Sequence, residues 1–265
     1  MLITLSNIIA IYRKELQGYF ASPLAYAIAS VFWLITGLFL VAILLSPDGL
    51  IPQVARLDQQ GVTQAIDVPY EFLQAFLGTL GSISLFILPM LSMGLYAEER
   101  KRGTLELLAT SPLTNWAVAV GKLLGVLTFY TTMLLPLMLC EAIALSASNP
   151  ALPPTVFFLG HIALILLGAS VLSLGMFVSS LTDSTILSAI LTFTLVLFLW
   201  MIKTTSSSIG GDLGKALDHL SLLTHYTNLV KGIVDTGSLT VFASYIILGV
   251  FLTAQFIEVL RFQRS

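Results

Sequence analysis

Six long apolar stretches, none with an Asp, Glu, Lys or Arg, constrain this chain more than any other feature of its sequence. A helix needs about 20 apolar residues to cross the hydrocarbon core of a bilayer. Only a structure that satisfies its own backbone hydrogen bonds can do so. The sequence therefore predicts one all-α integral membrane domain over residues 1–265, with six transmembrane helices. The predicted spans, each drawn around one stretch, are residues 24–45, 72–97, 115–145, 156–181, 184–203 and 239–259.

The composition excludes several classes of protein. Charged residues make up 10% of the chain, against roughly 25% in a soluble domain. The net charge of -2 provides no basic surface for nucleic acid. The single cysteine, Cys140, excludes an intrachain disulfide and a cysteine-rich metal site. The first residues lack the basic start, apolar core and cleavage site of a signal peptide.

The basic residues divide unevenly between the two sides of a six-span topology. If both termini share one side, that side holds eight of them: Arg13, Lys14, Arg100, Lys101, Arg102, Lys122, Arg261 and Arg264. The other side holds Arg56, Lys203, Lys215 and Lys231. Loops rich in Lys and Arg stay in the cytoplasm, so both termini are predicted to be cytoplasmic.

Residues 3–21 precede the first span and have the pattern of an amphipathic helix. Apolar residues recur at steps of three and four and include Tyr12 and Leu16, whereas Arg13 and Lys14 lie on the opposite side. This pattern predicts a helix along the cytoplasmic interface. The alternative is that the first span simply starts early, but charged residues in this segment are hard to bury in lipid.

The two long connections on the other side differ in pattern. Residues 46–71 are rich in Pro and Gly and are predicted to be a loop. Within residues 203–238, the first part is predicted to be a loop as well. Residues 215–235 have helical spacing, and we expect them to lie in the outer interface or to re-enter the membrane between spans.

A few polar residues near the side opposite the termini are candidate site residues. His219 and His225 are six residues apart and fall on different helix faces, so no metal site is predicted. His161 is interpreted as a hydrogen-bonded intramembrane histidine, with a proton relay as the alternative. Glu141 is interpreted as an interfacial residue, with a contact to substrate as the alternative.

The connection over residues 98–114 gathers much of the charge of the chain. Its charged residues are Glu98, Glu99, Arg100, Lys101, Arg102 and Glu106. Burying six charges in lipid would cost on the order of 15 kcal/mol or more, so the segment must be a water-exposed or interfacial loop. The charges alone do not exclude the alternative that this segment is a solvated loop whose only role is to fix the membrane topology.

The same loop has the local pattern of a turn followed by a very short helix. Gly103 permits the turn, and Thr104 can cap the helix. Leu105 and Leu108 then share one face, because they are three residues apart. Pro112 suits the start of the next helix. A helix of about six residues is not stable alone, so the protein or a partner must support it.

The stretch EERKRGTLELLATSPLTNWAVAVGK closely resembles the cytoplasmic loop of ABC-2-type permeases, the membrane subunits of one class of ABC transporters. Members commonly have the pattern E-x-x-x-G-T-[LI]-E-x-L-[LM]-x-[TS]-P. The matching residues here are Glu99, Gly103, Thr104, Leu105, Glu106, Leu108, Thr110 and Pro112. Segments near both ends of the chain resemble the branch that includes the gliding-motility and nitrous-oxide-reductase maturation permeases.

The resemblance implies a coupling helix that docks in a cleft of an ATP-binding subunit. Its predicted contact residues are Glu98, Glu99, Arg100, Gly103, Thr104, Leu105, Glu106, Leu108 and Pro112. It also implies a second copy of the chain or a close relative in the membrane, with an auxiliary membrane or periplasmic protein as a further possible partner. The resemblance points to export across the inner membrane of a prokaryote.

The chain has no phosphate-binding G-x-x-x-x-G-K-[ST] motif. We therefore expect no catalysis and no cofactor in this chain, with ATP and Mg bound by the partner subunit. One alternative is a membrane scaffold or mechanotransmitter that acts on another protein. A second is an ion-coupled secondary transporter, which is disfavoured because the six uncharged stretches offer no charged group near the midplane.

Overall fold

The computed structural model describes residues 2–60, 67–105, 113–146, 148 and 151–262, and its regular elements in these ranges are all helices. They are α1 (Leu2–Ala21), α2 (Pro23–Leu45), α3 (Leu50–Gln59), α4 (Val68–Ser92), α5 (Ala97–Lys101), α7 (Asn115–Ser146), α8 (Pro154–Leu181), α9 (Thr185–Ile209), α10 (Gly211–Leu220), α11 (Leu222–Val230) and α12 (Thr236–Phe262). Six of them, α2, α4, α7, α8, α9 and α12, are long and apolar enough to cross a membrane. The predicted fold class is confirmed.

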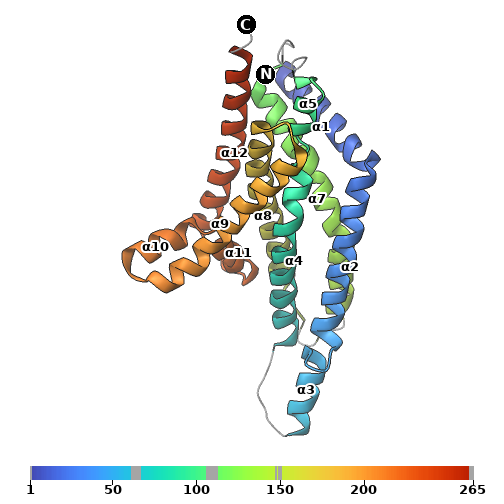
Figure 1. Ribbon diagram of the computed structural model, residues 1–265. Coiled ribbons are helices and arrows are strands. Elements are labelled where there is room, and N and C mark those ends of the chain that lie inside the picture. The colour runs from blue at the N-terminus through green and yellow to red at the C-terminus, as the bar shows by residue number, and fades with distance from the viewer. Residues whose placement is uncertain (1, 61–66, 106–112, 147, 149–150, 263–265) are drawn as a thin grey trace.

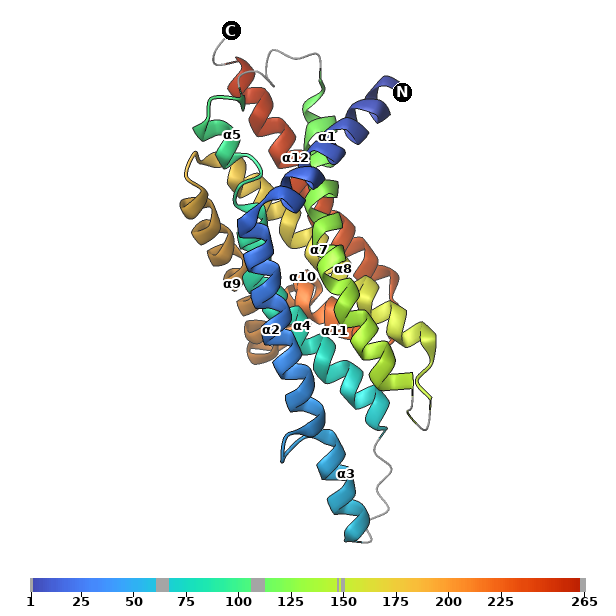
Figure 2. The same cartoon turned by 90° about the vertical axis from the view of Figure 1, so that its right-hand side faces the viewer.

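The spans form an elongated bundle with both termini at one end (Figures 1 and 2). We call this the terminal end, and it also carries α1 and α5. The opposite end, which carries α3, is the far end. Helix α8 lies at the centre, is the most buried span, and contacts α4, α7, α9, α11 and α12. Helices α2 and α9 expose large apolar side chains such as Leu34 and Phe198. Such faces suit contact with lipid rather than water.

The helix of the second predicted span, residues 72–97, is interrupted near its end. Helix α4 stops at Ser92, and a turn over residues 93–96 leads into α5. Backbone N–H groups at the start of α5 donate to the hydroxyl of Ser179 on α8 instead of continuing the helix. A buried backbone donor needs such a partner, and this one lies about 80 residues away in sequence, beyond the reach of a local pattern.

Two segments predicted to be loops contain helix. Helix α3 forms within residues 46–71, where Pro52 falls in its first turn and costs no helical hydrogen bond. Helix α9 continues through Thr204 to Ile209. There, Ser208 donates its hydroxyl to the carbonyl of Thr204 at 3.1 Å. Ser and Thr can bond back to the preceding turn in this way, which satisfies their hydroxyls inside a helix.

The segment predicted to be helical over residues 215–235 is two helices instead of one. Helices α10 and α11 meet at Ser221, whose hydroxyl accepts from the backbone N–H of Thr224 and so caps α11. Together with the end of α9 they project sideways from the bundle (Figure 1). They lie level with the middle of α4 and well short of α3 (Figures 1 and 2).

Candidate functional site

The described part of the charged loop is attached to α8 by hydrogen bonds. The hydroxyl of Ser179 accepts from the backbone N–H groups of Tyr96 and Ala97 at 3.1 and 3.0 Å. The same hydroxyl donates to the carbonyl of Met93 at 2.8 Å. One residue further along α8, the carbonyl of Ser180 accepts from Nη1 of Arg100 at 3.0 Å. Helix α5 is therefore held at both its start and its middle by the end of the central span.

A buried lysine joins the same loop to two other helices. The side chain of Lys122, on the first turns of α7, is only 2% exposed. Its Nζ lies 2.9 Å from Oε1 of Glu15 on α1 and 3.0 Å from Oε1 of Glu99 on α5. It also donates to the carbonyl of Leu95 at 2.7 Å. A lysine ammonium has three protons, so each of them has an acceptor.

A second lysine completes the arrangement. Nζ of Lys14 lies 3.1 Å from Glu99 and 3.7 Å from Glu15, and its side chain is largely exposed. Partial burial lowers the pKa of Lys14, but Glu99 and Glu15 outweigh this effect, and the pKa is raised. We call Lys14, Glu15, Glu99 and Lys122 the four-charge cluster. Its two positive and two negative charges balance, which allows it to be partly buried without an uncompensated charge.

Close backbone contact brings α1 within reach of Lys122. A Cβ atom on Gly125 of α7 would lie 2.7 Å from Cβ of Glu15, and one on Gly121 would lie 2.9 Å from Cβ of Ile11. Such distances are shorter than real Cβ atoms adopt, so a larger residue would push the helices apart. Small residues four apart are a common means of close helix packing in membranes. Here they place α1 directly against the first turns of α7.

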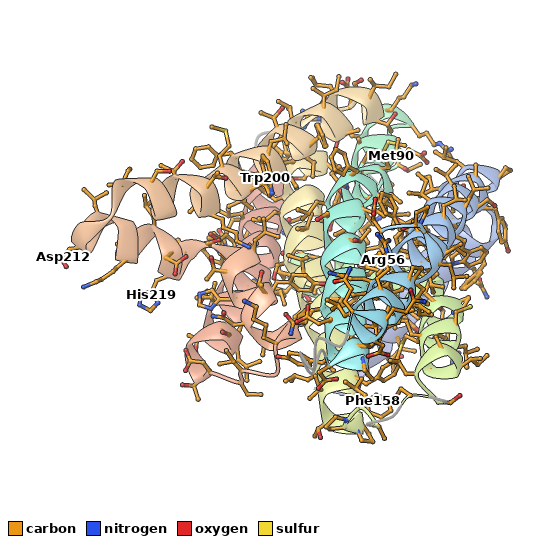
Figure 3. All side chains as sticks on the ribbon, turned by 90° about the horizontal axis from the view of Figure 1, so that it is seen from below. Arg56, Met90, Phe158, Trp200, Asp212 and His219 are labelled. Atoms are coloured by element: carbon orange, nitrogen blue, oxygen red, sulfur yellow. The ribbon has the colours of Figure 1, made fainter. Side chains whose placement is uncertain are left out.

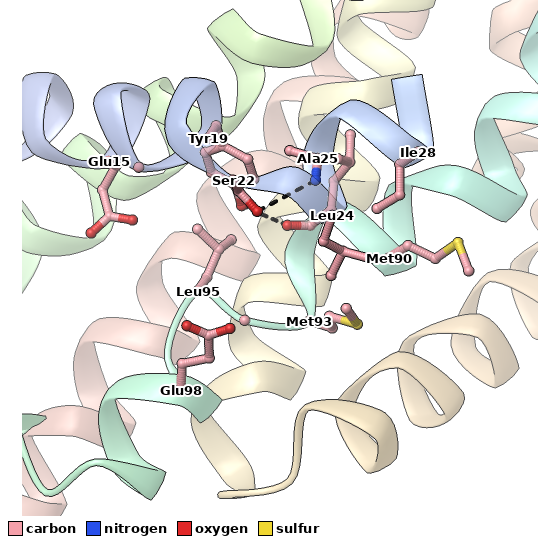
Figure 4. Close-up of a pocket in the computed structure, with 13 residues that line it drawn as sticks. Glu15, Tyr19, Ser22, Leu24, Ala25, Ile28, Met90, Met93, Leu95 and Glu98 are labelled. Atoms are coloured by element: carbon pink, nitrogen blue, oxygen red, sulfur yellow. Dashed lines mark hydrogen bonds between the residues drawn. The ribbon is translucent and has the colours of Figure 1, made fainter. Parts of the chain in front are cut away.

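On its other side, the turn before α5 borders a cavity of about 200 Å³ between α1, α2 and α4. Figure 4 shows Glu15 and Glu98 at one side of this cavity and Leu24, Ile28 and Met90 at the other. The hydroxyl of Tyr19 at its wall donates to the carbonyl of Leu91 at 2.6 Å. Burial, with a smaller contribution from Glu15 and Glu98, raises the pKa of Tyr19, so the hydroxyl stays a neutral donor.

The residues predicted for the coupling loop fall in three groups. Glu99 and Arg100 make the contacts given above, while Glu98 is half-exposed and lies 3.5 Å from Arg102. Gly103 has a φ of 70° and ends α5, and the hydroxyl of Thr104 donates to the carbonyl of Glu99. Leu105 is half-buried against the core of the protein itself. The rest of the predicted set, Glu106, Leu108 and Pro112, lies outside the described residues.

The residues predicted for the N-terminal helix lie on α1, with mixed exposure. Arg13 and Lys14 are exposed, and Tyr12 and Leu16 are partly buried. Leu16 packs against the core. The two strongest partners in the four-charge cluster, Glu15 and Lys122, were missed as site residues. Two features of the sequence could have indicated these residues. They are the glycines four residues apart in α7 and the presence of a lysine near the start of a predicted span.

A second buried polar contact lies further from the loop, between α7 and α8. Glu141 is completely buried and His161 is 2% exposed. Nε2 of His161 lies 3.3 Å from Oε1 of Glu141, and Nδ1 lies 2.9 Å from the carbonyl of Phe157. Glu141 was predicted to be an interfacial residue; its helix continues to Ser146, and its side chain is buried inside the protein against α8. The predicted third span therefore carries two buried ionisable groups, Lys122 and Glu141.

The protonation of this pair follows from its geometry. A carbonyl oxygen can only accept, so Nδ1 of His161 must carry a proton to bond to Phe157. Nε2 then either accepts from a protonated Glu141 or donates to an ionised one. In both cases the Nε2–Oε1 contact holds one proton and the pair has no net charge. A satisfied histidine, as predicted, fits this contact.

Comparison with known proteins gives a family match over nearly the whole chain. Residues 9–265 match the family described as ABC-2 family transporter protein. No curated protein matches the sequence closely. The match includes α1 from Ile9 onward, all six spans and the charged loop. It does not identify a branch of the family.

Proposed function

The chain belongs to the ABC-2 transporter family and is a membrane permease subunit of an ABC transporter, and we propose that it works as an exporter driven through its charged loop by a separate ATP-binding subunit. The four-charge cluster is the observation that carries this proposal. It ties α5 to α1 and α7, while Ser179 and Ser180 tie α5 to α8. A push on the loop would therefore reach three helices at once.

We place the terminal end in the cytoplasm, where an ATP-binding subunit would meet α5. The division of eight basic residues against four supports this orientation, and the inner membrane of a prokaryote is the proposed location. Helix α1 would then lie along the cytoplasmic interface with Arg13 toward water.

The orientation is tested with single cysteines in a Cys140→Ala background. Arg102 is exposed at the terminal end and Leu213 is exposed on α10. An impermeant thiol reagent should label position 213 in intact cells and position 102 only after lysis. Labelling of position 102 in intact cells would rule out the proposed orientation.

The docking face of the loop is proposed to include Leu108. Leu105 was predicted to share this face, but it already packs against the protein's own core, so Leu108→Asp is the cleaner test. It would bury an unpaired carboxylate in the contact at a cost of several kcal/mol, and about 2.8 kcal/mol is a hundredfold in affinity. The ATP-binding subunit should no longer co-purify with this variant.

Lys101→Glu is the matched control, because Lys101 is exposed and rim charges act mainly through screened attraction. A thermal melt of each purified variant shows that the membrane domain is intact. If Leu108→Asp binds the ATP-binding subunit like the wild type, Leu108 is not in the contact, and the loop returns to the role of a topology signal.

The partner assignments rest on the family and on the sequence. We propose that two copies, or this chain and a close relative, form the membrane part, with an auxiliary membrane or periplasmic protein as a further partner. The branch of the gliding-motility and nitrous-oxide-reductase maturation permeases remains our prediction. Because no phosphate-binding motif is present, ATP turnover should require the separate subunit, and the purified chain alone should show none.

Mechanical work on another membrane protein is the second candidate function. The four-charge cluster favours it as much as it favours export, because the cluster would transmit force whatever the force acts on. Reconstitution with the ATP-binding subunit separates the two: an exporter moves a solute or lipid across a sealed vesicle without any further protein.

A further inference from the structure

Helix α7 contains a proline in its interior, and this residue interrupts the backbone hydrogen bonding of the helix. Pro136 lies well inside the range Asn115–Ser146. Proline has no N–H, so the carbonyl of Thr132, four residues earlier, has no helical donor, and the proline ring crowds that carbonyl. In transmembrane helices such a defect is tolerated where neighbouring helices or side chains satisfy the affected groups. The neighbours of Pro136 therefore decide how firmly α7 is held at this point.

Trp33 of α2 supplies a hydrogen-bond donor beside this defect. Its indole Nε1 donates to the carbonyl of Met133 at 2.8 Å. Trp33 lies 100 positions earlier in the chain, on a helix that passes beside α7 (Figures 1 and 2). Met133 directly follows Thr132, and its helical donor is the N–H of Leu137, the residue directly after the proline. The indole thus bonds to the turn that Pro136 interrupts.

The turns before the proline carry two threonines that bond back along the helix. Thr131 and Thr132 donate their hydroxyls to the carbonyls of Leu127 and Thr128, each at 2.8 Å. Such bonds often bend a helix. Together with Pro136, these threonines place three features that favour a bend within one short stretch, residues 127–137.

The exposed face of α7 does not resist a bend at this stretch. Leu135 and Leu139 expose 50% and 65% of their surface, and Pro136 between them is exposed as well. An apolar face of this kind suits contact with lipid. A closely packed protein interior opposes small changes of shape, whereas lipid chains can yield to them.

The polar contacts of α7 with other helices divide at the proline. Before it, Lys122 joins α7 to α1 and α5, and Tyr130 donates to the hydroxyl of Ser84 on α4 at 2.8 Å. Beyond it, Glu141 contacts His161 on α8. The two parts of α7 therefore have different polar partners, and a change of angle between the parts lets one set of partners move without the other.

We propose that α7 bends at Pro136, and that the bond from Trp33 to Met133 holds the two parts of α7 at a fixed angle. When this bond breaks, the part with Lys122 is free to tilt while the part with Glu141 stays against α8. This inference goes beyond the proposed function, because it concerns movement within the permease itself, without ATP or a partner.

The experiment is amide hydrogen exchange of the purified chain, followed by mass spectrometry. Bending opens backbone hydrogen bonds around Pro136, so exchange over residues 133–140 measures it. Trp33→Phe removes the indole N–H but keeps an aromatic ring. It should make exchange there about fivefold faster, as expected for the loss of one hydrogen bond. Exchange over residues 117–125, where α7 packs against α1, should stay as in the wild type.

Pro136→Ala tests whether the proline is the cause. It restores the missing N–H, so exchange over residues 133–140 should be slower than in the wild type. Trp33→Phe should then have no further effect in the Pro136→Ala background. Trp200→Phe is the matched control, because it removes an indole from α9, which lies on the opposite side of α4 from α2 (Figures 1 and 3). A thermal melt shows that each variant is folded.

Three outcomes overturn the proposal. The first is unchanged exchange over residues 133–140 in Trp33→Phe. The second is an equal increase from Trp33→Phe with and without Pro136→Ala, because Trp33 then acts on α7 independently of the proline. The third is faster exchange over residues 117–125 as well, or the same increase in Trp200→Phe, because the effect is then a general loosening of the bundle.

Discussion

The two ends of α7 each bury an ionisable group, but the two contacts are built differently. Lys122 near its start meets two carboxylates from α1 and α5 and a carbonyl from the turn before α5. Among the residues that the structure describes, Glu141 near its other end meets only His161 on the neighbouring span. The first contact joins three separate elements and borders water through Lys14. The second joins two spans and is buried.

This difference determines how each contact responds when a helix is displaced. In the four-charge cluster the charges are fixed, so a displaced helix leaves an unpaired charge behind and the cost rises steeply. At the other end of α7, the Glu141–His161 pair has no net charge, because the contact holds one proton. A displacement of α7 against α8 there costs less free energy. We therefore propose that the four-charge cluster transmits the signal, whereas the Glu141–His161 pair only holds α7 and α8 together.

The largest effect is expected for Lys122→Met. It removes the central cation and leaves Glu15 and Glu99, whose side chains are each 14% exposed, facing each other. Breaking a buried pair by removing one partner costs about 3 to 5 kcal/mol, and partial exposure places this case at the lower end. The variant should melt several degrees lower and lose coupling to the ATP-binding subunit.

Lys14→Met is the matched control, since it removes a largely exposed lysine from the same cluster. It should melt close to the wild type, because exposed ion pairs contribute about 0 to 1 kcal/mol. Tryptophan fluorescence follows both melts. Equal melting temperatures of the two variants would mean that the burial of Lys122 does not contribute to stability. The proposed difference between the two ends of α7 would then be wrong.

A smaller effect on the melting temperature is expected for the Glu141–His161 pair. It should depend on the shape and hydrogen bonding of the side chains rather than on their charge. Glu141→Gln supplies an amide N–H that can donate to Nε2 of His161, so it reproduces one of the two protonation states and should melt like the wild type. His161→Phe leaves the buried carboxyl without its partner and should cost about 1 to 3 kcal/mol.

These two melts also distinguish the two forms of the Glu141–His161 pair. If Glu141→Gln destabilises the protein as much as His161→Phe, the pair depends on an ionised carboxylate, and the form with a protonated Glu141 is excluded.

Much of the fold could be predicted because it depends on local composition. The uncharged stretches set six spans. The predicted break between residues 21 and 24 is confirmed, because α1 ends at Ala21 and Ser22 caps α2. These features depend on residues within a few positions of each other. The same applies to Gly103, whose positive φ ends α5.

The site could be predicted only in part because its contacts are distant in sequence. Lys122 and Glu15 are 107 positions apart, and no local periodicity connects them. Glu141 was placed at the interface because it follows the uncharged stretch of its span, yet its partner His161 is 20 positions away on another helix. The hydrogen bonds of Ser179 to the backbone of α5 depend on where α4 ends, which no local pattern shows.

The smallest effect is expected where the loop meets α8, and two adjacent residues allow a clean comparison. Arg100 donates to the carbonyl of Ser180 at 3.0 Å, whereas Lys101 is exposed. Arg100→Ala should cost about 1 kcal/mol, a typical net value for one partly exposed hydrogen bond, and Lys101→Ala close to nothing. Hydrogen exchange followed by mass spectrometry should show faster exchange over residues 96–101 in Arg100→Ala only. If neither variant changes the exchange, the bonds to Ser179 hold α5 by themselves, and Arg100 is free to contact the ATP-binding subunit. If both variants change it equally, the charge of the loop matters more than its attachment, and α8 loses its place beside α1 and α7 as a receiver of the signal.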